Sequence, residues 1–144
     1  MKKVIMFMMC LFCIQSATFA DNDRIIQFSQ LPTNAQQMVN AQFKNKQVVY
    51  VNQDGILLKT FDVVLNDATK IEFDGKGQWK EVDMNTQAVP EFFIPASIQN
   101  YVKANYPGTI ITCIDVERGL KEIKLSNGLE LKFNSRDQLI EIDD

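Results

Sequence analysis

The sequence holds few side chains that commonly do catalytic chemistry. It contains no histidine among its 144 residues, and histidine is a frequent general base and a common transition-metal ligand. Cys113 lies in a predicted strand beside Ile111 and Ile114, where nothing nearby would activate its thiol as a nucleophile. A structural role therefore explains this cysteine better than catalysis does.

Acidic residues are numerous, but they mostly alternate with lysines along predicted strands, as in Lys70/Glu72 and Glu130/Lys132. Such alternation is typical of opposite charges paired across neighbouring strands on a water-facing surface, at about 0.2–1 kcal/mol per pair. It gives no reason to expect two carboxylates converging for acid–base catalysis. We therefore expect no catalytic residue and no enzyme activity.

Two short segments contain residue types that are found in calcium-binding loops, Asn52-Gln53-Asp54-Gly55 and Asp74-Gly75-Lys76-Gly77. Neither offers the alternating oxygen ligands and the distant glutamate that such a loop requires. The second segment also precedes a predicted strand, whereas a phosphate-binding glycine loop precedes a helix. Turn formation explains both segments, and we expect no metal and no cofactor.

Trp79 is the residue that most suggests a binding surface. If Val82 points into the core, strict alternation places Trp79 beside Glu81 on the charged face, and an exposed tryptophan among charges is typical of binding hot spots. A bulge after Gly77 would instead turn the indole into the core, and both arrangements remain open. The candidate partner-binding residues are Trp79, Lys70, Glu72, Glu81, Glu130, Lys132, Leu139 and Glu141.

These residues belong to a pattern that occurs twice, opening at Leu31-Pro32 and again at Ile94-Pro95. Each segment begins with apolar residues at helical spacing, which predicts one amphipathic helix of about three turns. Each then continues as strands joined by short turns, which implies antiparallel pairing. The first three strands of each segment are predicted at 48–51, 60–65 and 70–73, and at 111–114, 121–125 and 130–133.

Alternation along these strands separates an apolar face from a charged face. Phe61, Phe73 and Phe133 point to the apolar side, and most of the acidic and basic residues point to the other. One dry face and one charged face are expected of an antiparallel sheet with helices on one side. The connection at 84–93 is too short to link independent domains, so we predict a single domain over 21–144, with repeats at about 24–83 and 89–144.

The first twenty residues have the composition of an export signal. Lys2 and Lys3 precede an unbroken apolar run at 4–14, and Thr18 and Ala20 form a small-x-small cleavage site. Residues 1–20 are therefore predicted to be a signal peptide. The apolar run is too short for a transmembrane helix, which needs about 20 residues.

Cleavage after Ala20 would remove Cys10 and Cys13, which leaves Cys113 without an internal disulfide partner. Lipidation of Cys10 or Cys13 is disfavoured because large residues, not small ones, precede both. Cleavage would also change the formal net charge from −3 to −5. This balance gives no electrostatic reason to bind nucleic acid or anionic lipid. We expect a periplasmic or secreted protein with no stable membrane anchor.

Four segments carry a resemblance to a known family: residues 28–32, 71–83, 89–95 and 126–133. Together they make the chain similar to the PepSY-like, beta-lactamase-inhibitor-like family of exported bacterial proteins over 21–144. The resemblance implies an α+β fold: a tandem repeat of one helix plus a four-stranded antiparallel sheet, with the helices on one face of a broad curved sheet. It supplies no catalytic site. Asn134-Ser135-Arg136-Asp137 departs from the Asp-x-x-Gly turn of the first repeat, and we expect this turn to be formed less tightly.

The sequence therefore predicts an exported, non-enzymatic binding module. The inhibitor-like name suggests docking of an unidentified envelope or secreted protein on the open sheet face, by analogy of shape. The alternative is a periplasmic carrier that holds a small apolar or peptide ligand between the sheet and the helices. A carrier would have an enclosed cavity lined by Phe61, Phe73 and Phe133.

Overall fold

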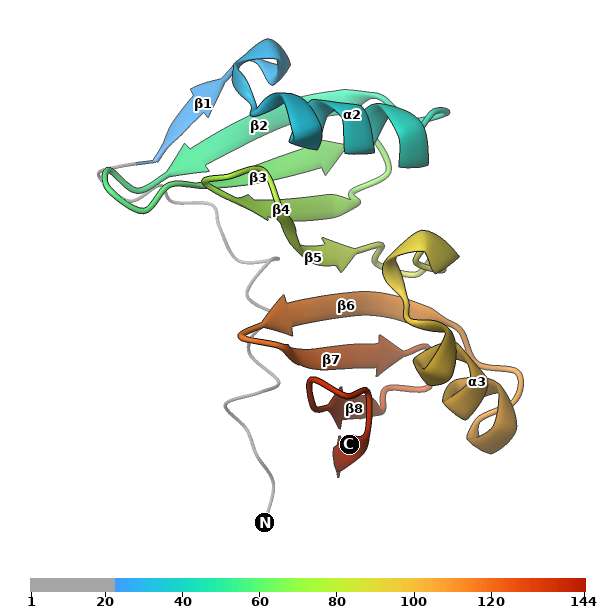
Figure 1. The fold of residues 1–144 in the computed structure, drawn as a ribbon. Coiled ribbons are helices and arrows are strands. Elements are labelled where there is room, and N and C mark those ends of the chain that lie inside the picture. The colour runs from blue at the N-terminus through green and yellow to red at the C-terminus, as the bar shows by residue number, and fades with distance from the viewer. Residues whose placement is uncertain (1–22) are drawn as a thin grey trace. The chain divides into compact units, whose positions relative to one another are not determined.

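The computed structural model describes residues 23–144, so the predicted signal peptide at 1–20 lies outside the described residues. Nine strands form one sheet in sequence order, from β1 to β9 (Figure 1). The strands are β1 (Arg24–Ile26), β2 (Val48–Asp54), β3 (Thr60–Leu65), β4 (Lys70–Asp74), β5 (Trp79–Asp83), β6 (Ile111–Glu117), β7 (Leu120–Leu125), β8 (Glu130–Phe133) and β9 (Leu139–Asp143). The helices are η2 (Phe28–Gln30), α2 (Thr33–Gln42), η3 (Glu91–Phe93) and α3 (Ala96–Asn105).

The predicted tandem repeat of one helix plus a four-stranded sheet is wrong. The described strands do not divide into two four-stranded sheets: β1 pairs with β2, and the order continues to β9 as a nine-stranded sheet. Residues 23–144 are mostly sheet, with two ten-residue α-helices. The prediction failed because side-chain periodicity identifies strands but not the place where a sheet ends. That place depends on which backbone N–H and C=O groups lie alongside one another.

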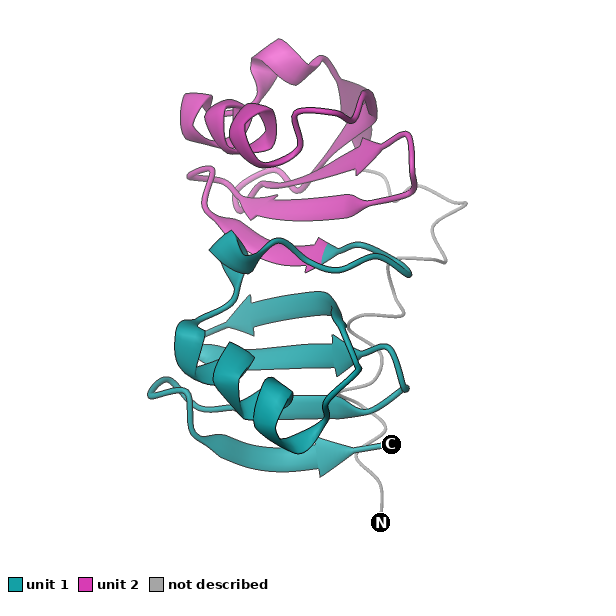
Figure 2. Cartoon of the chain, turned by 90° about the vertical axis from the view of Figure 1, so that its right-hand side faces the viewer, with its two compact units in different colours: residues 1–14, 83–144 teal, residues 15–82 magenta. Residues whose placement is uncertain are grey.

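The chain divides into two compact units, coloured magenta and teal in Figure 2, and each is described by itself. The N-terminal unit covers the described residues 23–82. Strands β1 to β4 pair antiparallel in this unit. The side chains of Val63, Ile71 and Phe73 are fully buried on β3 and β4, and α2 contributes Ala35 and Val39 to the core.

A glutamine side chain joins α2 to the segment before it. Gln36 Nε2 donates hydrogen bonds to the carbonyl oxygens of Leu31 (2.8 Å) and Ser29 (3.1 Å). Ser29 lies within the 3-10 turn η2 and Leu31 directly follows it, where backbone acceptors would otherwise need water. The side chain therefore fixes the direction from which the chain enters the helix.

The C-terminal unit covers residues 83–144, and β6 to β9 pair antiparallel in it. Ile114, Ile123 and Leu131 lie opposite one another in the register and are fully buried. Helix α3 crosses the face of the strands in Figure 2, and the ring of Tyr101 packs edge-on against Phe133 with centroids 5.8 Å apart. This contact places α3 over the apolar face of β8.

Candidate functional site

Lys70 and Glu72 lie together on the polar side of β4 in the N-terminal unit. Both are half-buried and alternate with the fully buried Ile71 and Phe73. Asp62 lies opposite Glu72 in the register of β3 and β4, and its Oδ2 is 3.9 Å from Lys70 Nζ. Two predicted site residues therefore share one surface with an aspartate that the prediction had not included.

Trp79 and Glu81 lie on β5, the last strand of that unit. Trp79 is half-buried, whereas Glu81 is only 4% exposed. The indole is therefore partly accessible to a partner, while the Glu81 carboxylate cannot contact one without moving. The role of both residues in binding stays a prediction.

The other four predicted residues lie in the C-terminal unit. Lys132 lies opposite Glu141, with Nζ 3.8 Å from Oε1. Leu139 lies opposite Phe133. A register shift between Lys132 and Phe133 separates Leu139 from the Lys132–Glu141 pair. Glu130 is only 3% exposed. The structure thus brings Lys132 and Glu141 together, and their role in binding also stays a prediction.

Glu122 and Asp115 extend this polar row, although neither was among the predicted site residues. Asp115 lies opposite Glu122, which lies opposite Lys132. Burial, together with the charges of Glu130 and Asp115, raises the pKa of Glu122 to about 8, against the opposing charge of Lys132. Alternation along the strand is enough to place Glu122 on the polar face. The acidic neighbours that raise its pKa follow only from the register of the strands.

Several carboxylate oxygens in this row have no hydrogen-bond partner among residues 83–144 or the rest of the described chain. They are Oε1 of Glu122 and both side-chain oxygens of Glu130. Burial is also the main cause of a raised pKa for Glu130, with Lys124 opposing it. An unpaired buried carboxylate is costly in a folded protein, so this surface favours a proton or a positively charged ligand.

A second group of oxygen-bearing side chains lies at the start of the sheet, in the N-terminal unit. Asn52 and Asp54 are two residues apart on β2, and Asn52 lies opposite Asp62 on β3. The sequence reading placed residues 52–55 in a turn, but β2 continues to Asp54. The strand turns later than predicted, so Asn52 and Asp54 point to one face of the sheet.

Asp23 completes this group. A hydrogen bond between the side chains of Asp23 and Asp54 is the main cause of a raised pKa for Asp54, followed by burial. Burial raises the pKa of Asp62, and the charges of Asp54 and Asp23 raise it further, against Lys70. Oδ1 of Asn52 and Oδ1 of Asp62 have no hydrogen-bond partner among residues 23–144.

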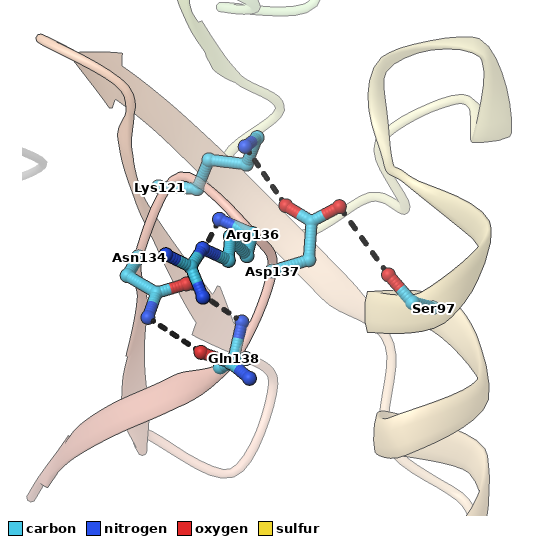
Figure 3. Close-up of polar contacts among 6 residues, drawn as sticks. All are labelled: Ser97, Lys121, Asn134, Arg136, Asp137 and Gln138. Atoms are coloured by element: carbon cyan, nitrogen blue, oxygen red, sulfur yellow. Dashed lines mark hydrogen bonds and ion pairs between the residues drawn. The ribbon is translucent and has the colours of Figure 1, made fainter.

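Figure 3 shows the turn from Asn134 to Gln138, which side-chain hydrogen bonds hold in the same way as its counterpart at Asp74. Asn134 Oδ1 accepts hydrogen bonds from the backbone N–H groups of Arg136 (2.9 Å) and Gln138 (3.0 Å). Asp74 Oδ1 accepts the same two bonds from Lys76 and Gln78 at 2.9 and 3.0 Å. The expectation of a less tightly formed turn is therefore wrong, because an amide oxygen replaces the carboxylate oxygen as the acceptor.

The phenylalanines expected to line a carrier's cavity are core residues. Phe73 and Phe133 are almost completely buried and Phe61 is nearly so. Phe133 is covered by the ring of Tyr101. These side chains pack against the protein itself, which gives no support to a ligand held between them.

The fold and the polar surfaces together define a mostly antiparallel β protein with partly buried carboxylates on its polar faces. The family described as "Putative beta-lactamase-inhibitor-like, PepSY-like" matches residues 59–141. The chain belongs to this PepSY-like family, which confirms the resemblance found in the sequence. No curated protein matches the chain.

Three solved structures of similar proteins come from Bacteroides species. A "putative calcium-regulated periplasmic protein" from Bacteroides thetaiotaomicron is 40% identical, with a TM-score of 0.82 over 85% of this chain and 97% of that one. A "putative periplasmic protein from DUF2874 family" from Bacteroides vulgatus is 37% identical, with a TM-score of 0.83 over 88% of this chain and 100% of that one. Another Bacteroides vulgatus protein, a "putative periplasmic protein of unknown function", is 34% identical, with a TM-score of 0.81 over 85% and 99%.

All three neighbours are named as periplasmic proteins. This confirms the predicted periplasmic or secreted location. Within residues 23–144, no helix has the length and the apolar character needed to cross a membrane.

Proposed function

We propose that this protein is an exported, non-enzymatic binding module that takes a basic partner protein on the polar surface of its sheet. The inhibitor-like description of its family supports a role in binding rather than in catalysis. The partner would be another envelope or secreted protein, since the neighbours are periplasmic. No role for nucleic acid or for a stable membrane anchor is part of the proposal.

The observation that best supports the proposal is the buried, unpaired state of Glu122 and Glu130 in the C-terminal unit. Their oxygens without hydrogen-bond partners in the described chain are buried, so they would accept hydrogen bonds from a lysine or arginine of a partner once the two side chains turn outward. Charge-assisted bonds of this kind are stronger than those between neutral groups. A basic partner would therefore favour the ionised form of these two carboxyl groups, beyond what Lys132 and Lys124 already do.

Affinity capture from the native envelope tests this proposal. The baits are the wild type, Trp79→Ala, and the charge-reversal variant Glu141→Lys, which changes the polar row that contains Lys132 and Glu122. Lys103→Glu, which changes an exposed residue in the last turn of α3, serves as the control. We expect the wild type and the control to recover the same basic protein, and the other two variants to lose it. Recovery of the same protein by the charge-reversal bait would refute binding on the polar surface.

A second candidate function is a response to calcium. The Bacteroides thetaiotaomicron neighbour, 40% identical, is named as calcium-regulated, and this chain has an oxygen-rich group at the start of its sheet. We therefore propose that calcium also acts on this protein. Equilibrium dialysis against CaCl₂, with MgCl₂ as the comparison, tests the response: the absence of calcium uptake would exclude it and would leave the proposal of a basic partner standing.

A further inference from the structure

We infer that Asp23, Asn52, Asp54 and Asp62 form a Ca²⁺ site in the N-terminal unit. The inference rests on the proposed calcium response only for the choice of ion. The location is argued from the arrangement of these four side chains. It assigns a ligand to Asn52 and Asp54, which turn formation alone explained in the sequence, and adds Asp23 and Asp62 to them.

Three neighbouring strands bring the four side chains together. Asn52 and Asp54 are two positions apart on β2, so their side chains leave the same face of the strand. Asp62 on β3 lies directly opposite Asn52. Arg24 of β1 lies opposite Gln53, which puts Asp23 at the position next to Asp54.

The charges in this group are unfavourable without a cation. Asp23 and Asp54 lie at neighbouring positions across β1 and β2, and carboxylates side by side repel each other unless a proton or a cation lies nearby. Asp62 follows on the next strand, opposite Asn52. Three acidic residues therefore lie on neighbouring strands, and Lys70 Nζ lies 3.9 Å from Oδ2 of Asp62.

Asn52, the neutral side chain of the group, gives separate evidence for a ligand. Asn52 is only 9% exposed, and its Oδ1 has no hydrogen-bond partner anywhere in residues 23–144. Oδ1 of Asp62 is buried without a hydrogen-bond partner in the same way. A buried amide oxygen without a partner is rare in folded proteins, and a metal ion bound between Asn52 and Asp62 would use both oxygens.

The ligand types select calcium among the common metal ions. All four side chains offer oxygen, and Ca²⁺ takes about six to eight oxygen ligands from carboxylates, amide carbonyls and water in a flexible geometry. Mg²⁺ requires a near-ideal octahedron and keeps more of its water, so it fits this irregular group less well.

The polar row of the C-terminal unit fits a metal ion less well, although it too is acidic. Lys132 lies opposite both Glu122 and Glu141, and Lys124 lies opposite Glu130. These ammonium groups already reduce the negative potential of the row. The C-terminal row therefore provides a matched control within the same chain.

Isothermal titration of the full chain with CaCl₂ tests the site. We expect one ion to bind with a Kd of about 10⁻⁴–10⁻³ M, the range of extracellular calcium modules. Asp54→Asn and Asp62→Asn should each weaken binding at least about tenfold, since each removes a charged ligand. Glu122→Gln, in the C-terminal row, should bind calcium as the wild type does.

A melting experiment shows that loss of binding is not loss of folding. Without calcium, Asp54→Asn should melt at or above the wild-type temperature, because it relieves the repulsion from Asp23. Calcium should raise the melting temperature of the wild type and of Glu122→Gln, but not that of Asp54→Asn or Asp62→Asn. Wild-type affinity in Asp54→Asn and Asp62→Asn would overturn this location while the calcium response stands. Absence of binding by the wild type would overturn both, and neither result would affect partner capture in EGTA.

Discussion

At the scale of single residues, Gly77 shows how one position sets the approach of a helix to a turn. Its φ is +83°, and a Cβ added there would lie 2.1 Å from Asn34 Oδ1 and 2.8 Å from Pro32 Cβ. Asn34 also donates a hydrogen bond from Nδ2 to the carbonyl oxygen of Lys76 (3.0 Å). The start of α2 can therefore lie against this turn only because residue 77 has no side chain.

Gly77→Ala should lower the free energy of unfolding by about 2–4 kcal/mol, which combines left-handed backbone strain with overpacking. Gly128→Ala separates the two effects, because its φ is +94° but an added Cβ would meet nothing within 4 Å. The Gly128→Ala variant should therefore lose only about 1–2 kcal/mol of its free energy of unfolding. Urea unfolding measures both, and equal losses would show that the contact with Pro32 and Asn34 does not matter.

Glu122 predicts how stability depends on pH. Its ordinary pKa of 4.5 is raised to about 8 in the folded protein, chiefly by burial and then by Glu130 and Asp115. Between these values the folded state binds more protons than the unfolded state, so stability falls as pH rises. Glu122→Gln stays neutral throughout.

The variant should therefore match the wild type below about pH 4 and increasingly exceed it in melting temperature as the pH rises toward about 8. Thermal unfolding followed by circular dichroism across this range measures the difference. If the two proteins lose stability in parallel, the Glu122 carboxyl does not carry the raised pKa.

At the scale of elements, Asp137 joins a turn to a helix and to a neighbouring strand. Its Oδ2 accepts a hydrogen bond from Ser97 Oγ at 3.3 Å, in the first turn of α3, and its Oδ1 is 2.8 Å from Lys121 Nζ on β7 (Figure 3). A carboxylate at a helix N-terminus is also favoured by the helix dipole. The turn that carries Asp137 is therefore a fixed connection in the C-terminal unit.

Asp137→Ala should destabilise the protein by about 1–3 kcal/mol, the usual range for loss of charge-assisted hydrogen bonds. Asp137→Gly should cost less, since residue 137 has a φ of +62° that glycine adopts without strain. Ser135→Ala, at an exposed position of the same turn, is the control and should leave stability unchanged. Denaturation by urea ranks the three variants, and an Asp137→Ala protein as stable as the control would rule out the connection.

At the scale of the whole molecule, the sequence holds 18 acidic and 15 basic residues, a formal net charge of −3. If a basic partner binds as proposed, attraction between opposite charges should speed its association. Raising the ionic strength from about 0.05 M to about 0.5 M should slow association about tenfold or more, because salt shortens the range of these fields. Surface plasmon resonance with the captured partner measures the rate, and a salt-independent rate would argue for an apolar interface instead.

The positions of the local elements could be predicted from the sequence. Strands form at Thr60–Leu65 and Glu130–Phe133, where alternation predicted them, and the helices occupy Thr33–Gln42 and Ala96–Asn105. Phe73 and Phe133 are buried, as their side of the alternation required. These features follow from periods of 2 and 3.6 residues, which depend only on neighbours along the chain.

The candidate site was less predictable because its residues meet through pairing. Asn52 and Asp54 were visible as an oxygen-bearing pair, but Asp62 joins them only through the β2–β3 register and Asp23 only through β1. The same holds for Glu122, whose raised pKa depends on burial and on acidic neighbours from other strands. The spacing of residues along one strand does not predict which residues of other strands lie beside it.

The amino-acid sequence by itself determined which segments become strands and helices, which side chains face the core, and the family to which the chain belongs. Tertiary structure alone decided that the strands form one nine-stranded sheet and that Asp23, Asn52, Asp54 and Asp62 lie together. The physical reason is that periodicity is a local property of the backbone. Strand pairing and Coulomb energy instead depend on distances in space between residues far apart in the chain.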